Sequence, residues 1–349
     1  MDKKKIGYGQ YYTSGDPFRC GPFREWAQMA IRPGTVLLEP FAGSNNIVRM
    51  MRLGGWDNPW ACFDIDPPSR KLMAGFPVLE RDTLAFFPRG YRTAVTNPPF
   101  LYRSSARRKK IPFPDSVYDD LYKIALDTML EHCRYVAAIV PESFITSGLF
   151  HERLWAFVSL TQPMFDSTDC PAGLALFTAP GAKDTEDFPI YRQDQLLGSY
   201  LKLAEKIPAA GRHIPWKFND PCGEIGIRCI DSIREESIRF IPGADIPSAS
   251  IKISSRSLTR ISGLPENIPL DTFIDACNGI LANYRRTTHD VFLTSFKGLR
   301  KDGLYRRRLD FAAARSIMDL AAEQIQKKGN ISCPLPLHDP SACSFMQSL

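Results

Sequence analysis

Short apolar runs recur along the first half of the chain, and most of them end in an acidic or amide residue. Such runs are typical of strands inside a parallel sheet, because both faces of those strands are covered. Segments with helical periodicity or small-residue turns separate them, and repeated strand–helix units indicate a doubly wound, mostly parallel α/β sheet. The predicted strands are 36–38, 60–66, 76–82, 93–96, 135–140 and 173–177.

Helix signals fall between and after these strands. Asp16 ahead of Pro17 is a good N-cap followed by a proline in the first turn. The pair Gly54-Gly55 is a stop signal for the helix before it. The predicted helices are 17–30, 46–53, 116–133, 270–284 and 309–328, whereas 220–262 reads as short strand-like runs broken by Pro and Gly, such as 226–230 and 248–253.

The turn after the first strand reads Glu39-Pro40-Phe41-Ala42-Gly43-Ser44. A strand, a small-residue turn and a helix form the element that binds nucleotide-like ligands at the carboxyl ends of strands. Gly43 lets the backbone approach such a ligand, although turns of this kind are often rich in Gly and Ser for conformational reasons alone. Asp64 follows about twenty residues later, where an acid can accept hydrogen bonds from ribose hydroxyls. A helix N-cap is the alternative there, and it fits Asp66 better than Asp64.

The fourth predicted strand delivers the segment Asn97-Pro98-Pro99-Phe100. Two prolines fix two φ angles and remove two backbone donors, and the residue before them is pushed toward an extended conformation. The resulting stiff turn can hold a flat ring that bears an amino group, since the Asn97 amide oxygen and the Pro98 carbonyl accept hydrogens and Phe100 offers a stacking face. An ordinary turn after a strand is the alternative.

Composition narrows the class of protein. With 349 residues, two domains are expected. The nine cysteines form no C-x-x-C pair and lie near no histidine cluster, so no metal site or disulfide framework is indicated and reduced thiols in the cytoplasm are expected. No run of eighteen apolar residues and no secretory signal are present, so no membrane partner is expected. The net charge of +6 is compatible with a polyanionic partner.

In residues 8–180 the order of these motifs resembles that of S-adenosylmethionine-dependent methyltransferases that act on the amino group of adenine in DNA, with a recognition region after the catalytic domain. Gln10-Tyr11-Tyr12-Thr13 is similar to the N-terminal cofactor motif of that family, and Asn97-Pro98-Pro99-Phe100 matches its catalytic tetrapeptide. The resemblance implies S-adenosylmethionine as cofactor. It implies cofactor contacts from Tyr12, Thr13, Glu39, Pro40, Phe41, Ala42, Gly43, Asp64, Ile65 and Asp82, and catalytic roles for Asn97, Pro98, Pro99 and Phe100.

Two positions depart from the family pattern or leave it poorly defined. Asn45 stands where the family has a second glycine, and Asn is the non-glycine residue most tolerant of a left-handed backbone. Phe165 is our candidate for a second wall of the base pocket, with core packing as the alternative. A base inside a duplex cannot reach such a pocket, so the target must be flipped out and stacked.

Two basic segments suit a nucleic-acid partner. The first, 103–110, follows the tetrapeptide as a loop, and the second, 280–310, has eight Lys or Arg against three acids, hence a net charge of +5. Solvated surface loops are the alternative for both. The predicted nucleic-acid contacts are Arg107, Arg108, Lys109, Arg285, Arg286, Arg300, Arg306 and Arg307.

An acidic hinge at 184–187 divides the expected domains, a methyltransferase domain at 1–185 and a DNA target-recognition domain at 186–349. The expected partner is double-stranded DNA in a restriction-modification or mobile-element setting. A cognate restriction endonuclease is a candidate further partner, and a monomer is expected. The alternatives are methylation of RNA adenine or protein glutamine, and an inactive nucleic-acid-binding protein with the same fold, for which Asn45 is the supporting residue.

Overall fold

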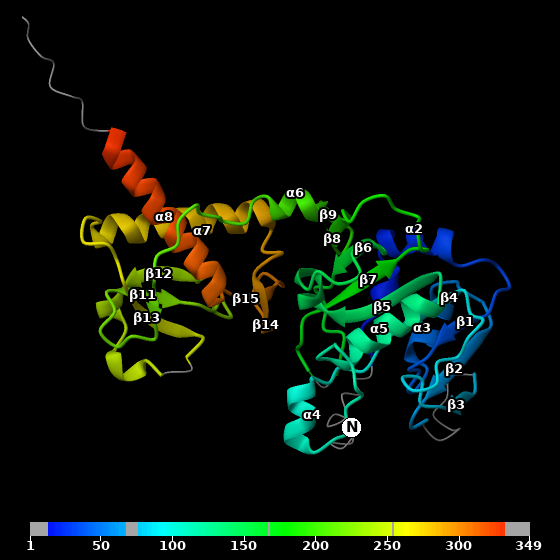
Figure 1. Cartoon of the computed structure of the whole chain (residues 1–349). Coiled ribbons are helices and arrows are strands. Elements are labelled where there is room, and N and C mark those ends of the chain that lie inside the picture. The colour runs from blue at the N-terminus through cyan, green and yellow to red at the C-terminus, as the bar shows by residue number, and fades with distance from the viewer. Residues whose placement is uncertain (1–12, 68–75, 167, 253–254, 332–349) are drawn as a thin grey trace, which may run out of the picture. The chain divides into compact units, whose positions relative to one another are not determined.

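A computed structural model of the chain describes residues 13–67, 76–166, 168–252 and 255–331. It forms two compact units (Figure 1). The first unit comprises the chain up to Ile207 together with 230–237 and 285–308, and the second comprises 208–229, 238–284 and the chain from Leu309 onward. Segments distant in the sequence therefore join the first unit.

The first unit is built on a nine-stranded sheet in the described part of the chain, with the order β3-β2-β1-β4-β5-β7-β6-β8-β9. The first five strands in this order, β3-β2-β1-β4-β5, are parallel to one another. Strands β7 and β9 run antiparallel to their neighbours. The strands are β1 (Leu37–Glu39), β2 (Trp60–Asp64), β3 (Val78–Glu80), β4 (Thr93–Thr96), β5 (Tyr135–Pro141), β6 (Leu154–Ser159), β7 (Ala172–Phe177), β8 (Pro189–Arg192) and β9 (Gln195–Ser199).

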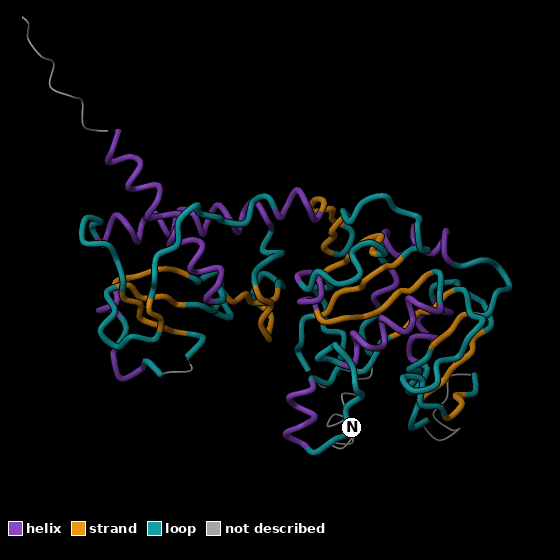
Figure 2. Tube along the Cα trace, in the orientation of Figure 1, coloured by secondary structure: helices purple, strands orange, loops and turns teal. Residues whose placement is uncertain are grey.

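Helices cover both faces of this sheet (Figure 2). The helices of this unit are η1 (Pro17–Arg19), α2 (Gly21–Ala30), α3 (Asn46–Leu53), α4 (Arg103–Lys109), α5 (Leu121–His132), η3 (Glu142–Thr146) and α6 (Tyr200–Ala204), of which α2, α3 and α5 pack on the sheet. Leu37 and Leu38 show how the layers arise, because successive side chains of a strand point to opposite faces. Leu37 packs in the core that contains α2 and α3, and Leu38 packs in the core that contains α5. The predicted α/β fold with a mostly parallel sheet is confirmed.

Several predicted helices and strands have the bounds that the structure shows, and other predicted bounds differ from the structure. The helix 46–53 and the strand 93–96 have the predicted bounds. The predicted helix 17–30 is split into η1 and α2, because the extended residue Cys20 ends the first helix and α2 begins after it, with Pro22 in its first turn. The helix predicted at 116–133 begins only at Leu121, after its N-cap Asp120. The basic segment expected as a loop after the tetrapeptide contains helix α4.

The sheet continues past the predicted domain boundary through β8 and β9, and the boundary at 185/186 thus falls inside the first unit. The basic segment near 300 also belongs to this unit and forms an antiparallel ribbon of β14 (Thr294–Leu299) and β15 (Tyr305–Arg308). The division into catalytic and recognition functions remains a prediction.

The second unit is α+β, as predicted for the smaller C-terminal part. Its four-stranded antiparallel sheet has the order β10-β13-β11-β12 among the residues described. Its elements are β10 (Lys217–Phe218), β11 (Ile225–Arg228), β12 (Arg239–Pro242), η4 (Gly243–Asp245), η5 (Ser248–Ser250), β13 (Leu258–Ser262), α7 (Leu270–Thr288, of which 285–288 count with the first unit) and α8 (Phe311–Ile331). Where a strand-like run was predicted at 248–253, the structure has η5.

Buried aromatic and polar contacts hold the second unit together. Trp216 packs on Phe273 with ring centroids 5.5 Å apart. The indole Nε1 of Trp216 donates a 2.7 Å hydrogen bond to the buried carboxylate of Asp319 in α8. The residue just before β10 and helix α8 are therefore joined by a satisfied polar contact inside an apolar core.

Candidate functional site

The candidate site lies at the carboxyl edge of the parallel strands. Because β1 to β5 run in the same direction, the residues that follow them meet at one edge. The strand order reverses between β1 and β4, and this switch point is where open α/β sheets bind ligands. Glu39 ends β1 and Asn97 follows β4, so the two sequence motifs lie on either side of the switch point.

The glycine turn is fixed by hydrogen bonds to the end of β2. The amide of Ala42 donates to the Phe63 carbonyl at 2.8 Å, and the amide of Gly43 donates to Asp64 Oδ2 at 2.9 Å. Gly43 has a φ of +49°, in the left-handed region that glycine adopts without strain. The turn therefore presents its backbone at the sheet edge.

Asn45 adopts the left-handed backbone that its residue type tolerates, with φ 60° and ψ 28°. It is fully buried, and its Nδ2 donates a 2.8 Å hydrogen bond to the Phe76 carbonyl. The turn thus keeps its form without a second glycine, and Asn45 links it to the segment before β3.

The carboxyl group of Glu39 lies at this edge with a strongly raised pKa. Only 1% of the residue is exposed. Its Oε1 accepts hydrogen bonds from the Phe41 amide at 3.1 Å and from the Thr96 hydroxyl at 2.6 Å, while Oε2 has no hydrogen-bond partner among the described residues. Burial raises the pKa of Glu39 to about 8, despite these two hydrogen bonds. A buried carboxyl whose second oxygen has no hydrogen-bond partner among the described residues suits a cationic ligand group.

Asp64 ends β2, Ile65 follows it, and Asp82 follows β3. Asp64 is buried, and it accepts from the amides of Gly43 and Asp66, each at 2.9 Å. Ile65 exposes 58% of its surface, which leaves an apolar side chain beside that carboxylate. Asp82 is exposed, and its Oδ1 accepts from two amides of the turn that it begins, Leu84 and Ala85, each at 3.1 Å.

Thr13 reaches the same region from the N-terminal motif. It is buried, pairs as an antiparallel bridge with Phe165, and its carbonyl accepts a 2.9 Å hydrogen bond from Asn46 Nδ2 at the start of α3. Tyr12 lies outside the described residues. The structure therefore brings Thr13 next to both the glycine turn and the segment that follows β6.

The tetrapeptide leaves β4 with its aromatic ring held by two other rings. Phe100 lies edge-on to Phe165 with centroids 5.9 Å apart, and edge-on to Tyr122 of α5 at 6.0 Å. Phe165 is buried, so it packs in the core as well as contacting Phe100. The ring of Phe100 is only partly buried, and its orientation is set by both neighbours.

Sequence analysis missed Asp120, which holds the backbone just after the tetrapeptide. Its Oδ1 accepts a 3.0 Å hydrogen bond from the Leu101 amide, and its backbone pairs with Tyr102. The residue is buried, its Oδ2 has no hydrogen-bond partner in the described part of the chain, and burial raises its pKa to about 6. The sequence signal was its place as an N-cap before an apolar helical run.

Of the predicted nucleic-acid contacts, Arg107, Arg108 and Lys109 are exposed in the last turn of α4. Arg286 is exposed, whereas Arg306 is partly buried and its Nε donates a 2.7 Å hydrogen bond to the Asp231 carbonyl.

Three other predicted contacts are not surface groups. Arg285, Arg300 and Arg307 are only 7%, 4% and 6% exposed. Arg285 binds Asp231 through two hydrogen bonds of 2.9 Å, and Arg300 binds the same carboxylate at 3.1 Å. Arg307 binds Glu142 through two hydrogen bonds of 2.9 and 3.1 Å. Their guanidinium groups are occupied by buried carboxylates, so the expectation of phosphate contacts from these three residues does not fit the structure.

Within the residues described, no group of three or more His, Cys, Asp or Glu side chains could hold a metal ion. No described helix is long and apolar enough to cross a membrane.

No protein-family model and no curated protein sequence matches the chain. Similar solved structures include the methyltransferase subunit of a type I restriction-modification system from Streptococcus thermophilus, with 15% identity over 52% of this chain and 47% of that one, and a TM-score of 0.36. The type IIG restriction endonuclease BpuSI is 14% identical over 53% of this chain and 27% of that one, with a TM-score of 0.40. The M protein of the type I restriction enzyme EcoKI is 12% identical over 74% and 68%, with a TM-score of 0.36. The chain thus spans about half or less of the first two, and the similarity concerns the fold alone.

Proposed function

We propose that the chain is a DNA methyltransferase that transfers a methyl group from S-adenosylmethionine to the exocyclic amine of an adenine flipped out of the duplex. The observation that carries the proposal is the pairing of two motifs at the switch point. Thr96, the residue before Asn97, donates its hydroxyl hydrogen to Glu39 at 2.6 Å. The stiff turn that can hold an amine and the buried acid that can hold a cation are therefore neighbours.

The residues present fit the cofactor. The open oxygen of Glu39 suits a positively charged ligand group, and Gly43 allows a close backbone approach. Asp64 and the exposed Ile65 offer a hydroxyl acceptor beside an apolar surface, as a nucleoside requires. Thr13, Pro40, Phe41, Ala42 and Asp82 complete the proposed binding residues. When bound, the cofactor supplies a methyl group activated by its sulfonium.

The proposed chemistry of the tetrapeptide is positional. An adenine amine is a poor nucleophile, because its lone pair is delocalised into the ring. The Asn97 side-chain oxygen and the Pro98 carbonyl would accept its two hydrogens and favour a pyramidal nitrogen, whose lone pair then points at the methyl group. Pro98 and Pro99 keep the two acceptors in a fixed geometry, since both φ angles are restricted. The nitrogen loses one proton to solvent after the transfer.

Phe100 is the proposed stacking surface for the flipped base. Its edge contacts with Phe165 and Tyr122 leave little freedom to rotate, which lowers the entropy lost when a base stacks on it. Asp120 holds the Leu101 amide and so fixes the backbone on the far side of the ring.

The exposed cations of α4 are the proposed contacts to the phosphates beside the flipped nucleotide. Arg107, Arg108 and Lys109 lie within ten residues of Phe100, on a helix that begins three residues after it. Exposed cations gain from phosphate contact through release of counterions. A cytoplasmic restriction-modification setting, with a cognate endonuclease as partner, is part of the proposal.

The experiment is methyl transfer from labelled S-adenosylmethionine, with duplex DNA, total RNA and a protein extract offered separately. Label in duplex DNA, recovered as methyladenine after digestion, is the expected result. Label in RNA or protein would replace the proposed substrate while leaving the cofactor site intact. Failure to bind the cofactor and to transfer label would refute the proposal.

A further inference from the structure

The ribbon β14–β15 belongs to the same compact unit as the catalytic sheet, although it lies about two hundred residues after the tetrapeptide. Its two strands pair antiparallel, with an irregular register between Ser295 and Leu299. The alternating burial along β15 gives the ribbon an inner face with Tyr305 and Arg307 and an outer face with Arg306 and Arg308. The two faces have different partners.

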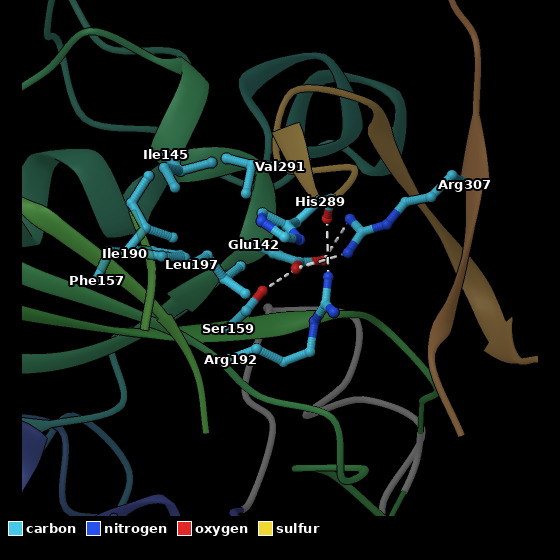
Figure 3. A pocket seen from close by; sticks show the side chains of 10 residues that line it. All are labelled: Glu142, Ile145, Phe157, Ser159, Ile190, Arg192, Leu197, His289, Val291 and Arg307. Atoms are coloured by element: carbon cyan, nitrogen blue, oxygen red, sulfur yellow. Dashed lines mark hydrogen bonds and ion pairs between the residues drawn. The ribbon is translucent and has the colours of Figure 1, made fainter. Parts of the chain in front are cut away.

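The inner face is anchored on Glu142, the residue that directly follows β5 (Figure 3). Arg307 binds both carboxylate oxygens of Glu142, and the hydroxyls of Ser159 and Ser295 donate to the same carboxylate. Burial alone raises the pKa of Glu142, but Arg307 holds it below its usual range. The pair is thus an ionic contact with its hydrogen-bonding capacity filled, which fixes geometry.

A second anchor holds the turn of the ribbon. Arg300 binds Asp231 at 3.1 Å, and the amide of Arg307 donates to the same carboxylate at 3.2 Å. The amide of Lys301 donates to the Ile233 carbonyl at 3.1 Å. The ribbon is therefore fixed to its own unit at both ends.

These anchors put the ribbon beside the proposed target pocket. Glu142 follows β5, the neighbour of β4, whose end carries Asn97. The amide of Glu142 donates to the Pro171 carbonyl, which belongs to the same connection after β6 that carries Phe165 against Phe100. The ribbon and the tetrapeptide share one edge of the sheet.

Two cations of the ribbon, Arg308 on the outer face and Lys297 in β14, have no carboxylate partner among the described residues. Arg308 lies opposite Thr294, and its Nε is buried with no hydrogen-bond partner among the described residues. Arg306 lies over the ring of Phe296 with its guanidinium carbon 5.1 Å from the centroid. Lys297 is exposed. Phosphate oxygens accept from such donors, and a two-stranded ribbon is narrow enough to lie against a duplex groove.

We propose that the ribbon binds the phosphate backbone of the DNA duplex beside the flipped base, through Arg308 and Lys297. Glu142 and Arg307 act as positioning residues that hold the ribbon at the catalytic edge. This proposal rests on the proposed function and extends it, because it assigns a duplex contact to the unit that carries the catalytic sheet.

The first test is the salt dependence of binding to a DNA duplex by the double variant Lys297→Ala, Arg308→Ala. Each lost phosphate contact lowers the slope of log K against log salt by about 0.9, so a reduction of about 2 is expected. The control, Arg89→Ala with Arg134→Ala, removes two exposed cations that precede β4 and β5 at the opposite edge of the sheet, and its slope is expected to equal that of the wild type. An unchanged slope in the ribbon variant, or an equal loss in the control, overturns the proposal.

The second test separates positioning from fold stability. Arg307→Lys keeps the charge but loses the bidentate geometry, and Glu142→Gln keeps the shape but loses the charge. Both are expected to raise the KM for duplex DNA at least about tenfold and to lower the thermal unfolding temperature, because a buried ion pair is weakened or lost, while the KM for S-adenosylmethionine stays near wild type. An unchanged KM for DNA in both variants overturns the positioning role. Loss of cofactor binding by the wild type would instead count against the proposed function.

Discussion

Binding of S-adenosylmethionine should release a proton from Glu39. The pKa of this buried carboxyl is about 8 in the free protein, so near neutral pH most molecules carry it protonated. A cationic group brought to the open Oε2 favours the ionised form and lowers that pKa. Cofactor affinity should therefore rise with pH about tenfold per unit below about pH 8, and level off above it.

The magnitude follows from the fraction of ionised Glu39. At about pH 6 roughly 1% of the free protein has an ionised Glu39, and at about pH 8 roughly half does, which gives an affinity ratio of about 50. Glu39→Gln cannot ionise, and its affinity should vary little over the same range. Glu80→Gln removes an exposed acid at the end of β3 and serves as the matched control.

Isothermal titration calorimetry measures the effect directly. Titrations in two buffers of different ionisation enthalpy report the number of protons released, which should approach one per cofactor near pH 7 for the wild type and the Glu80→Gln control. It should approach zero for Glu39→Gln. Equal proton release by wild type and Glu39→Gln, or wild-type affinity that is flat between about pH 6 and 8, would refute the role given to this carboxyl.

Three further changes test separate parts of the structure. Phe100→Ala should raise the activation free energy of methyl transfer by about 1–3 kcal/mol through lost stacking, whereas Phe86→Ala, at an exposed phenylalanine, should not. The flipped state is measured with a 2-aminopurine probe at the target base, and equal fluorescence in both variants would contradict the role of Phe100. Asp120 keeps its proton in the folded protein up to about pH 6, whereas the unfolded chain loses it near pH 4, so the free energy of unfolding falls as pH rises through this window. In urea unfolding, Asp120→Asn should remove roughly 2–3 kcal/mol of that fall, and a pH profile identical to that of the wild type would count against the burial of Asp120. Asp231→Ala leaves Arg285 and Arg300 without their shared carboxylate and should lower the free energy of unfolding by about 3–5 kcal/mol. The control Asp302→Ala, at the half-exposed partner of Arg300, should lower it by under about 1 kcal/mol, and similar losses in both variants would refute the central role of Asp231.

The sequence predicted the parts of the fold that local signals determine. The bounds of α3 follow from the turn before it and the glycines after it, and β4 follows from an apolar run that ends at a proline pair. Glu39, Asp64 and Asn97 meet because parallel strands end at one edge, a rule that needs no knowledge of side-chain contacts.

The partners of the basic residues could not be read from the sequence. Arg285 and Asp231 are 54 residues apart, and Arg307 and Glu142 are 165 apart, so a charge run that looks solvent-exposed is neutralised by acids elsewhere in the chain. Glu142 could have been found by the same rule on strand ends, since it lies two residues after the predicted strand 135–140. Helix α4 was hidden by its charge, because a run of like charges is typical of a loop.

The most direct test of the central claim is nucleoside mass spectrometry of DNA from cells that express the wild-type chain or Asn97→Ala. We predict N6-methyladenine in the wild-type sample and none above background with Asn97→Ala, while the purified variant still binds S-adenosylmethionine and duplex DNA. Methyladenine at equal levels in both samples would contradict the role of the tetrapeptide. Its absence from both, with methyl transfer to DNA also absent in vitro, would contradict the function itself.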